Sequence, residues 1–470
     1  MQGDATDLAA AIRNGSLSAA EAMQASLAAA ARQEALGAIA YLDAAMGLAS
    51  ADARDRERQS EPDRFAARPF AGVPTLAKDL GGPFAGLPVT AGSRLFERER
   101  GEADSDLASR FRDAGFSLFG LTTSPEFGLS LASEPAIGPL CRNPLDPART
   151  AGGSSGGAAA AVAAGIVAIA HATDAGGSIR VPAACCGLVG MKPTRGAMPG
   201  GPSFGNHLAG IASELAVCRS VRDTALIFDR LNGSSRGPFP DPSPVDIDKG
   251  RLRIGLLADT GSVYLTDSVR LEAVEGAARA LESDGHQIVP LNWADFEWSV
   301  AASGRAFADI VSVNLAALMK AATLDESRAE PLTQAFAARG RALPAILLWN
   351  KLNDAVLVSR NLWALFDRVD CILMPMLSSA PLAIGSFPSD HADTDLHLER
   401  MTAFAPLACL ANISGFPALT LPFGQDEHAM PLPVQIMAPM GHEPRLLSLA
   451  ARLEAEGRWQ HRFPVAGFPS

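Results

Sequence analysis

The chain has 470 residues, of which 48% are hydrophobic and 19% charged, which is typical of a globular rather than a disordered protein. Its formal net charge of −11 argues against nucleic acid and anionic membranes as partners, because both bind basic surfaces. No basic start followed by an apolar run opens the chain, and no run of about 18 apolar residues occurs, so we expect no secretory signal, no membrane span and a cytoplasmic location.

The six cysteines are scattered through the chain. They lack CxxC spacing and have no histidine pairs nearby, so neither a zinc site nor a disulfide framework is indicated. We therefore expect buried, reduced thiols and no metal.

Hydrophobic period and capping residues predict the elements of the first half of the chain. Residues 4–46 have a helical period, and Ser18 and Glu21 form a capping box. Residues 52–64 are polar and predict a solvated helix face and loop. The other predictions are a strand over 70–78, a helix over 106–114, a strand over 116–121, a loop over 143–150, a helix over 158–164 and a strand over 166–170.

In the second half, residues 252–257, 267–283 and 286–290 predict a strand, an amphipathic helix and a strand, which together make a βαβ unit. Residues 301–366 are mostly helical in period and predict a lobe over the site. Two further buried strands are expected over 370–374 and 418–421. The stretch 233–244, rich in proline, glycine and serine, is the best candidate for a linker.

The densest motif is GGSSGG at 152–157, which contains Ser154 and Ser155. It matches G-x-S-x-G twice, the spacing of the nucleophile elbow of a histidine-dependent α/β-hydrolase, but that elbow requires a preceding strand and residues 144–150 predict a loop. A phosphate-binding P-loop also fails, because no Gly-Lys-Ser/Thr follows. A glycine-rich turn before an alanine helix fits the same letters.

A second motif, TDAGGS at 173–178, places Ser178 just past a predicted strand, 24 residues after Ser154. Two glycines before a serine can turn successive backbone amides inward as an oxyanion hole. Asp174 and Arg180 are spaced to pair and fix this loop, which is a structural role.

Upstream, Lys78 ends a predicted apolar strand and is flanked by Leu76, Ala77 and Leu80. A serine hydroxyl needs a base to become a nucleophile, and a lysine serves when burial keeps its amine neutral. A surface lysine at a strand end would show the same pattern.

Taken together, these motifs resemble the amidase signature family. The resemblance rests on GGSSGG, on TDAGGSIRVPA, on GLVGMKPT at 187–194, on AGVPTLAKDL at 71–80, on VTAGS at 89–93, on the Arg-Asn-Pro triplet at 142–144, and on NISGFPA at 412–418 and PLPVQ at 431–435. It spans about residues 18–454 and is densest between 150 and 194.

The resemblance implies an α/β fold with a large central mixed, twisted β-sheet flanked by helices on both faces. We expect one domain over 1–470, with an N-terminal helical segment (1–65), a signature core that carries the catalytic residues (66–232) and a second half (245–470) whose helical lobe lies near 300–366.

It also implies a Ser–cis-Ser–Lys triad. Ser178 matches the nucleophile, Ser154 the bridging serine after a non-proline cis peptide, and Lys78 the base. Ser155, Thr173, Asp174 and Arg180 match supporting residues, and the backbone amides of Ala175, Gly176, Gly177 and Ser178 match the oxyanion hole. Such a site implies an amidohydrolase that uses no cofactor and acts on a small-molecule carboxamide. A homodimer is a further expectation.

The sequence departs from the family pattern at two places, of which the first is tolerable because only a backbone amide is matched there. Ala175 stands where many members have threonine, and residues 205–223 read GIASELA where an SLDHVGP-like stretch is usual. With TTSPEF and ASEPAIG upstream, this region is similar to the 6-aminohexanoate-cyclic-dimer hydrolase-like amidases. It is less similar to the glutaminase subunit of a tRNA-dependent amidotransferase, which stays an alternative function.

The acyl pocket is expected outside the signature, in residues 126–131, 199–208 and 374–378 and in the helical lobe. Its candidate residues are mainly apolar and favour aryl or aliphatic amides; they are Phe127, Leu129, Phe204, His207, Trp349 and Met376.

Overall fold

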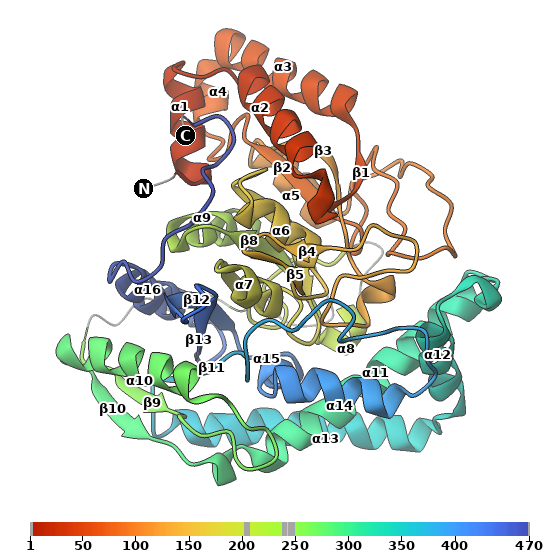
Figure 1. The fold of residues 1–470 in the computed structure, drawn as a ribbon, viewed down its shortest axis with the longest axis vertical. Coiled ribbons are helices and arrows are strands. Elements are labelled where there is room, and N and C mark those ends of the chain that lie inside the picture. The colour runs from red at the N-terminus through yellow and green to blue at the C-terminus, as the bar shows by residue number, and fades with distance from the viewer. Residues whose placement is uncertain (1–2, 202–206, 237–241, 243–249, 469–470) are drawn as a thin grey trace.

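The computed structural model describes residues 3–201, 207–236, 242 and 250–468, with the side chain of His207 left out. Four helices begin the chain and gather at one end of the molecule (Figure 1). Ser18 and Glu21 form the predicted capping box at the start of the second helix. The four helices are α1 (Ala5–Asn14), α2 (Ala19–Arg32), α3 (Ala44–Ser60) and α4 (Pro62–Ala66).

A small sheet packs against these helices and positions Lys78; its first strand lies between α2 and α3 in the chain. Its strands β1 (Ile39–Leu42), β3 (Ser117–Thr122) and β2 (Pro74–Lys78) lie in the order β1-β3-β2. The middle strand pairs antiparallel with β1 and parallel with β2, where Lys78 lies opposite Thr122. The predicted strand therefore forms and ends at Lys78, and helix α5 (Asp106–Asp113) precedes β3 as expected.

The large sheet has eight strands in the order β10-β9-β11-β13-β12-β7-β8-β6. The pairs β10/β9 and β9/β11 are parallel, and the five other pairs are antiparallel, so the predicted mixed sheet is confirmed. Its strands are β6 (Ile169–Asp174), β7 (Val189–Lys192), β8 (Ser213–Cys218), β9 (Arg253–Leu256), β10 (Gln287–Pro290), β11 (Cys371–Pro375), β12 (Ala418–Gln425) and β13 (Pro431–Met437).

Helices flank this sheet (Figure 1). The predicted βαβ unit forms from β9, α10 and β10. The helices after α5 are α6 (Gly156–Ala163), α7 (Arg180–Cys186), α8 (His207–Gly210), α9 (Val221–Leu231), α10 (Ser268–Ser283), α11 (Glu297–Ala321), α12 (Pro331–Ala342), α13 (Ala345–Phe366), α14 (Thr394–Phe404), α15 (Ala408–Ser414) and α16 (Glu443–Glu454).

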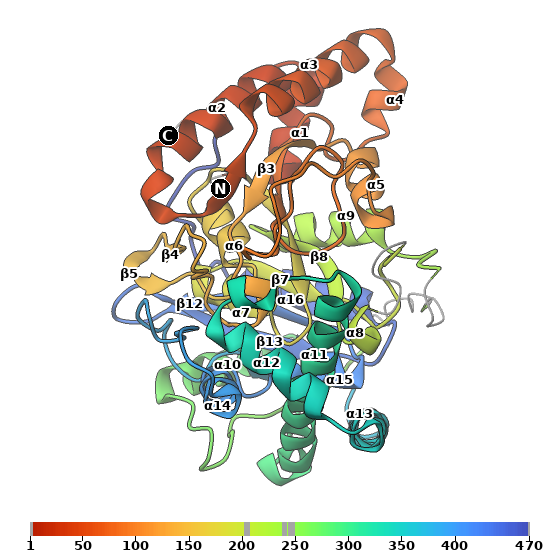
Figure 2. The same cartoon turned by 90° about the vertical axis from the view of Figure 1, so that its right-hand side faces the viewer.

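The predicted helical lobe corresponds to α11, α12 and α13, which lie at the end of the molecule opposite α1–α4 (Figures 1 and 2). The predicted linker, 233–244, falls largely outside the described residues. No helix in the part of the chain that the structure describes is long and apolar enough to cross a membrane.

Four local predictions were wrong in whole or in part. Residues 4–46, expected to be helical, also contain strand β1 at 39–42, which pairs with β3. Residues 143–150 form a hairpin of β4 (Arg142–Asn143) and β5 (Asp146–Thr150), because the Asn143 side chain accepts from the N–H of Leu145 and donates to the Thr150 carbonyl, which closes the turn. The strand expected at 166–170 begins at Ile169, since the N–H groups of Gly165 and Ile166 still bond to the end of α6. The polar stretch 52–64 begins with the end of α3, a largely solvated helix face as predicted, but helix α4 stands in place of the expected loop.

The two sheets touch where β2 meets β6, the edge strand of the large sheet. Thr75 Oγ1 donates a hydrogen bond of 2.8 Å to the carbonyl of Ile169 across this junction. Lys78 and Asp174 are the last residues of these two strands. The contact between β2 and β6 thus brings the lysine and the TDAGGS loop together at the C-terminal ends of the two strands.

Candidate active site

Lys78 is only 1% exposed, and its amine lies between two hydroxyls. Nζ is 2.7 Å from Oγ of Ser154 and 2.8 Å from Oγ1 of Thr173. Burial lowers the pKa of Lys78 to about 7, although the charges of Asp174 and Glu214 oppose this shift. A substantial fraction of the amine is therefore neutral near neutral pH.

Ser154 and Ser155 lie where the GGSSGG turn enters α6. The peptide bond between Gly153 and Ser154 is cis. A Cβ on Gly153 would lie 2.6 Å from the backbone nitrogen of Ala132, so glycine is required by this close approach. Ser155 donates from Oγ to the Thr173 carbonyl and accepts from the Thr173 N–H, which ties the turn to β6.

The loop after β6 folds around the carboxylate of Asp174. This carboxylate accepts hydrogen bonds from the backbone N–H groups of Gly177, Ile179 and Arg180 at 2.7, 3.2 and 3.4 Å. Gly177 has a φ of +117°, a conformation that side chains disfavour, which explains a glycine directly before Ser178. Ser178 is 7% exposed.

Arg180 locks this loop to the rest of the large sheet and its helices. Its guanidinium donates to both oxygens of Asp174, at 2.9 and 3.1 Å, and both side chains are fully buried. Further donations reach Gln435, Asn412 and the Ala408 carbonyl. Burial would raise the pKa of Asp174, but the charge and hydrogen bonds of Arg180 outweigh it and lower this pKa to about 2.

The amide groups of the loop divide into two sets. Gly177 donates its N–H to Asp174, so the structure gives this predicted oxyanion-hole amide a different partner. Among the described residues, the N–H groups of Ala175, Gly176 and Ser178 have no acceptor in the protein. These three residues line a cavity.

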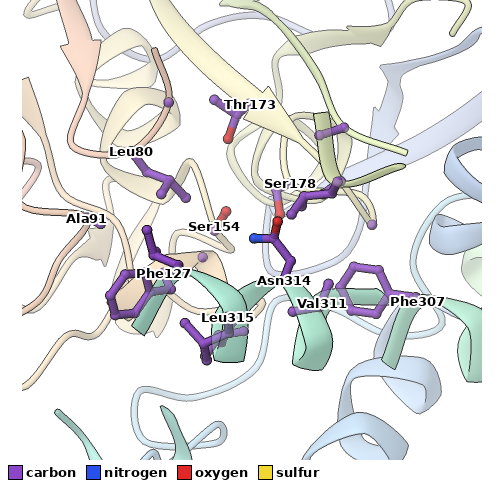
Figure 3. Close-up of a pocket in the computed structure, with 18 of the residues that line it drawn as sticks. Leu80, Ala91, Phe127, Ser154, Thr173, Ser178, Phe307, Val311, Asn314 and Leu315 are labelled. Carbon is purple, nitrogen blue, oxygen red and sulfur yellow. The ribbon is translucent and has the colours of Figure 1, made fainter. Parts of the chain in front are cut away.

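This cavity has a volume of about 300 Å³ and contains both Ser154 and Ser178 at its wall (Figure 3). Apart from the serines, Thr173, Glu214 and Asn314, its lining is apolar or glycine. The apolar side chains come from the loops after β2 and β3 and from α11; they include Leu80, Val89, Phe96, Phe127, Leu129, Phe307, Val311 and Leu315.

The predicted pocket residues are only partly brought together. Phe127 and Leu129 line the cavity. Met376 is buried outside the cavity lining, and Trp349 lies on the outer side of α13, where it is 62% exposed. The helical lobe does contribute to the cavity, but through α11 rather than α13. Phe204 and the side chain of His207 lie outside the described residues.

Sequence reasoning missed three polar residues at the site. Asn314 of α11 points its amide toward the two serines (Figure 3). His171 and Glu214 lie behind Lys78, and the imidazole Nε2 is 2.9 Å from Oε2 of Glu214. His171 could have been noticed because it directly follows the apolar run 166–170, seven residues before Ser178, whereas Asn314 and Glu214 carried no pattern.

Residues 21–447 match the protein family described as Amidase. The chain therefore belongs to the amidase family. This amidase is an amide-hydrolysing enzyme, and the resemblance found in the sequence is confirmed.

Individual relatives cover nearly the whole of this amidase. It is 33% identical to the 6-aminohexanoate-cyclic-dimer hydrolase of Paenarthrobacter ureafaciens, over 99% of this chain and 97% of that protein. It is 34% identical to the putative amidase AmiC of Mycobacterium tuberculosis, over 97% and 95%. A solved structure of 6-aminohexanoate cyclic dimer hydrolase matches with a TM-score of 0.89 and 29% identity, over 98% of each chain.

Proposed function

We propose that this amidase cleaves a carboxamide C–N bond through an acyl-enzyme on Ser178, with Ser154 as the bridging hydroxyl and Lys78 as the base. The observation that carries the proposal is the distance of 2.7 Å between Lys78 Nζ and Ser154 Oγ, with Ser154 and Ser178 on one cavity wall. The nearby histidine, His171, contacts the main chain of Lys78 rather than a serine, which favours the lysine as base over a histidine-dependent mechanism.

In this mechanism neutral Lys78 accepts the hydroxyl proton of Ser154, and Ser154 in turn accepts the hydroxyl proton of Ser178. At the same time Oγ of Ser178 bonds to the amide carbon. The proton then returns through Ser154 to the amide nitrogen, the C–N bond breaks and the amine leaves. Water attacks the ester carbon of the acyl-enzyme, its proton takes the same path, and the acid is released from Ser178.

The amides of Ala175, Gly176 and Ser178 are our candidates for the oxyanion hole. They belong to the loop held by Asp174 and Arg180, and donors fixed before the reaction stabilise a developing oxyanion by a few kcal/mol. Asn314 is placed to orient the polar end of the amide.

We propose a small, neutral amide with an apolar aryl or aliphatic acyl group as substrate. The aromatic and aliphatic cavity lining supports this, and a charged acyl group would lose its hydration there. One relative is by name a hydrolase of the 6-aminohexanoate cyclic dimer, so cyclic amides belong among the candidates.

The direct test is a hydrolysis screen over primary, aryl, linear-oligomer and cyclic amides, with Ser178→Ala as the control. We expect apolar amides to be cleaved and Ser178→Ala to be inactive. A fluorophosphonate should label wild type at Ser178 and fail to label Lys78→Ala. Full activity of Ser178→Ala, or a preference for glutamine, would contradict the proposal.

We also propose a cytoplasmic homodimer that does not bind nucleic acid. Six large apolar side chains of α13 are 43–65% exposed: Ile346, Leu347, Trp349, Val356, Leu357 and Trp363. They expose roughly 700 Å² of apolar surface, close to the ~800 Å² per partner of a standard interface.

The spacing on α13 favours a second copy as the partner. Ile346, Trp349, Val356 and Trp363 take a and d positions of a heptad. The two other a positions are held by Asn353, in the centre, and by Arg360. Arg360 is the one charged residue at these a and d positions, and the chain as a whole has a charge of −11, so an anionic membrane is a poor alternative. Two antiparallel copies would place Trp349 of each against Leu357 of the other.

Sedimentation velocity should give a dimer for wild type and a monomer for a Trp349→Glu, Val356→Glu double variant. Leu265→Glu, at a 77% exposed apolar residue elsewhere, should remain dimeric. In the antiparallel arrangement Asn353→Cys should cross-link two copies and Ile346→Cys should not. A monomeric wild type, or sedimentation with anionic lipid vesicles, would contradict this assembly.

A further inference from the structure

His171 and Glu214 form a buried pair directly behind Lys78. His171 is on β6 and fully buried, and Glu214, on the neighbouring strand β8, is 5% exposed. Glu214 lies opposite Thr173 in the strand pairing, so the pair and the hydroxyl that contacts the lysine amine share one strand end.

The contacts of His171 fix which of its nitrogens carries the proton. The backbone N–H of Lys78 donates to Nδ1 at 3.2 Å, and a backbone N–H cannot accept, so Nδ1 is unprotonated. The proton is then on Nε2, which donates to Oε2 of Glu214 at 2.9 Å. A neutral imidazole therefore links the main chain of the lysine to a carboxylate.

The surroundings hold this pair tightly. The rings of Phe84 and Phe111 pack edge-on against the imidazole, with centroids 5.0 and 5.6 Å away. The second oxygen of Glu214 accepts from the Gly82 N–H at 3.2 Å. A Cβ on Gly81 would lie 3.1 Å from Oε2 of Glu214, so the chain after Lys78 is packed against the carboxylate.

We propose that His171 and Glu214 are a positioning pair for Lys78, in which the imidazole holds the lysine main chain against the large sheet and the carboxylate sets the charge around its amine. This inference rests on the proposed role of Lys78 as base. Neither residue takes a proton from the substrate.

The charged groups around Lys78 determine how a change in the pair would alter the protonation of its amine. Asp174 on β6 and Glu214 on β8 both favour the ammonium form of Lys78, against its burial. Asp79, the next residue, turns away to accept from the N–H and hydroxyl of Thr90. Removing the charge of Glu214 should therefore make the lysine easier to deprotonate.

The test is the pH dependence of kcat/KM between pH 5.5 and 9.5 on one apolar amide. In Glu214→Gln the acidic limb should move down by about half to one pH unit, and in Glu214→Asp, which keeps the charge, it should stay near the wild-type position with a lower kcat. Glu443→Gln, which alters a buried carboxylate bound to the Thr194 N–H, is the matched control and should leave the limb in place.

The role of His171 is tested by comparing two variants, one that removes the hydrogen-bond acceptor of the Lys78 N–H and one that replaces it. His171→Leu should lower kcat at least about 10-fold with KM within about 2-fold, and His171→Asn, whose amide oxygen can take the place of Nδ1, should recover part of that loss. His461→Gln, at a half-buried histidine far from the site in sequence, should not lower kcat selectively.

Each outcome bears on one proposal. An unmoved or raised acidic limb in folded Glu214→Gln, or equal kcat for His171→Leu and His171→Asn, would overturn the positioning pair. If Glu214→Gln does not fold, the comparison of the two His171 variants decides. Activity retained in Lys78→Ala, or a wild type without an acidic limb, would instead overturn the proposed function.

Discussion

At the scale of single residues, Lys78 links burial to chemistry. Burial lowers its pKa to about 7, and only the neutral amine accepts a proton. We therefore expect kcat/KM to be low at pH 5.5, to rise tenfold per pH unit and to level off above about pH 8. A pH–rate profile on a neutral substrate measures this.

Lys192 serves as the control for assigning the acidic limb of this pH–rate profile to Lys78. Burial lowers its pKa to about 7 as well, but its Nζ donates to the carbonyl of Pro193. Lys192→Met should keep the acidic limb. A limb that disappears with Lys192 instead of Lys78 would contradict the assignment.

The Asp174–Arg180 pair predicts a large loss of stability. Arg180→Ala would leave the Asp174 carboxylate buried without its partner, which costs about 3–5 kcal/mol in the free energy of unfolding. Arg149→Ala, which breaks a half-exposed pair with Asp146, should cost at most about 1 kcal/mol. Denaturation in urea compares the two, and similar losses would contradict the structural role given to Arg180.

At the scale of elements, α11 sets the size of the cavity. Val311 faces the cavity between Phe307 and Leu315, so Val311→Phe should fill part of it and lower kcat/KM at least about 10-fold for long acyl groups, with little effect on the shortest amides. Ala317→Phe, at an exposed position of the same helix, should leave the profile unchanged. A chain-length series measures both, and a uniform loss over all lengths would contradict this role.

Elements with strong local signals could be predicted from the sequence. α10 begins where Asp267 caps it, and its amphipathic period gives its length. The β4–β5 hairpin could not be predicted, because its turn depends on the Asn143 side chain rather than on glycine. The start of β6 was misplaced because residues 165–168 are apolar in either case, and only the end of α6 decides how they fold.

At the scale of the whole molecule, the sequence indicated which residues to examine but not how they meet. Lys78 and Ser154 are 76 residues apart. The lysine ends β2 and the serine lies in a turn bonded to β6, so their approach depends on β2 lying against β6. Trp349 was misjudged for the same reason, because a helical period shows an apolar face but not which neighbour covers it. Residues whose function depends on a remote partner, such as Glu214 and Asn314, leave no local trace.

Lys78 belongs to the small sheet, whereas Ser178 follows β6 of the large sheet and the turn that carries Ser154 is bonded to β6. Catalysis therefore requires the two sheets to stay in contact. On heating, a small separation of β2 from β6 would abolish activity while both sheets remain folded. We expect the midpoint of reversible activity loss to lie below the midpoint of unfolding by circular dichroism. Thr75→Val, which removes the hydrogen bond to Ile169, should widen that gap. Coincident midpoints in wild type and in Thr75→Val would contradict this. If the midpoints differ, the loss of turnover on heating reports the separation of β2 from β6.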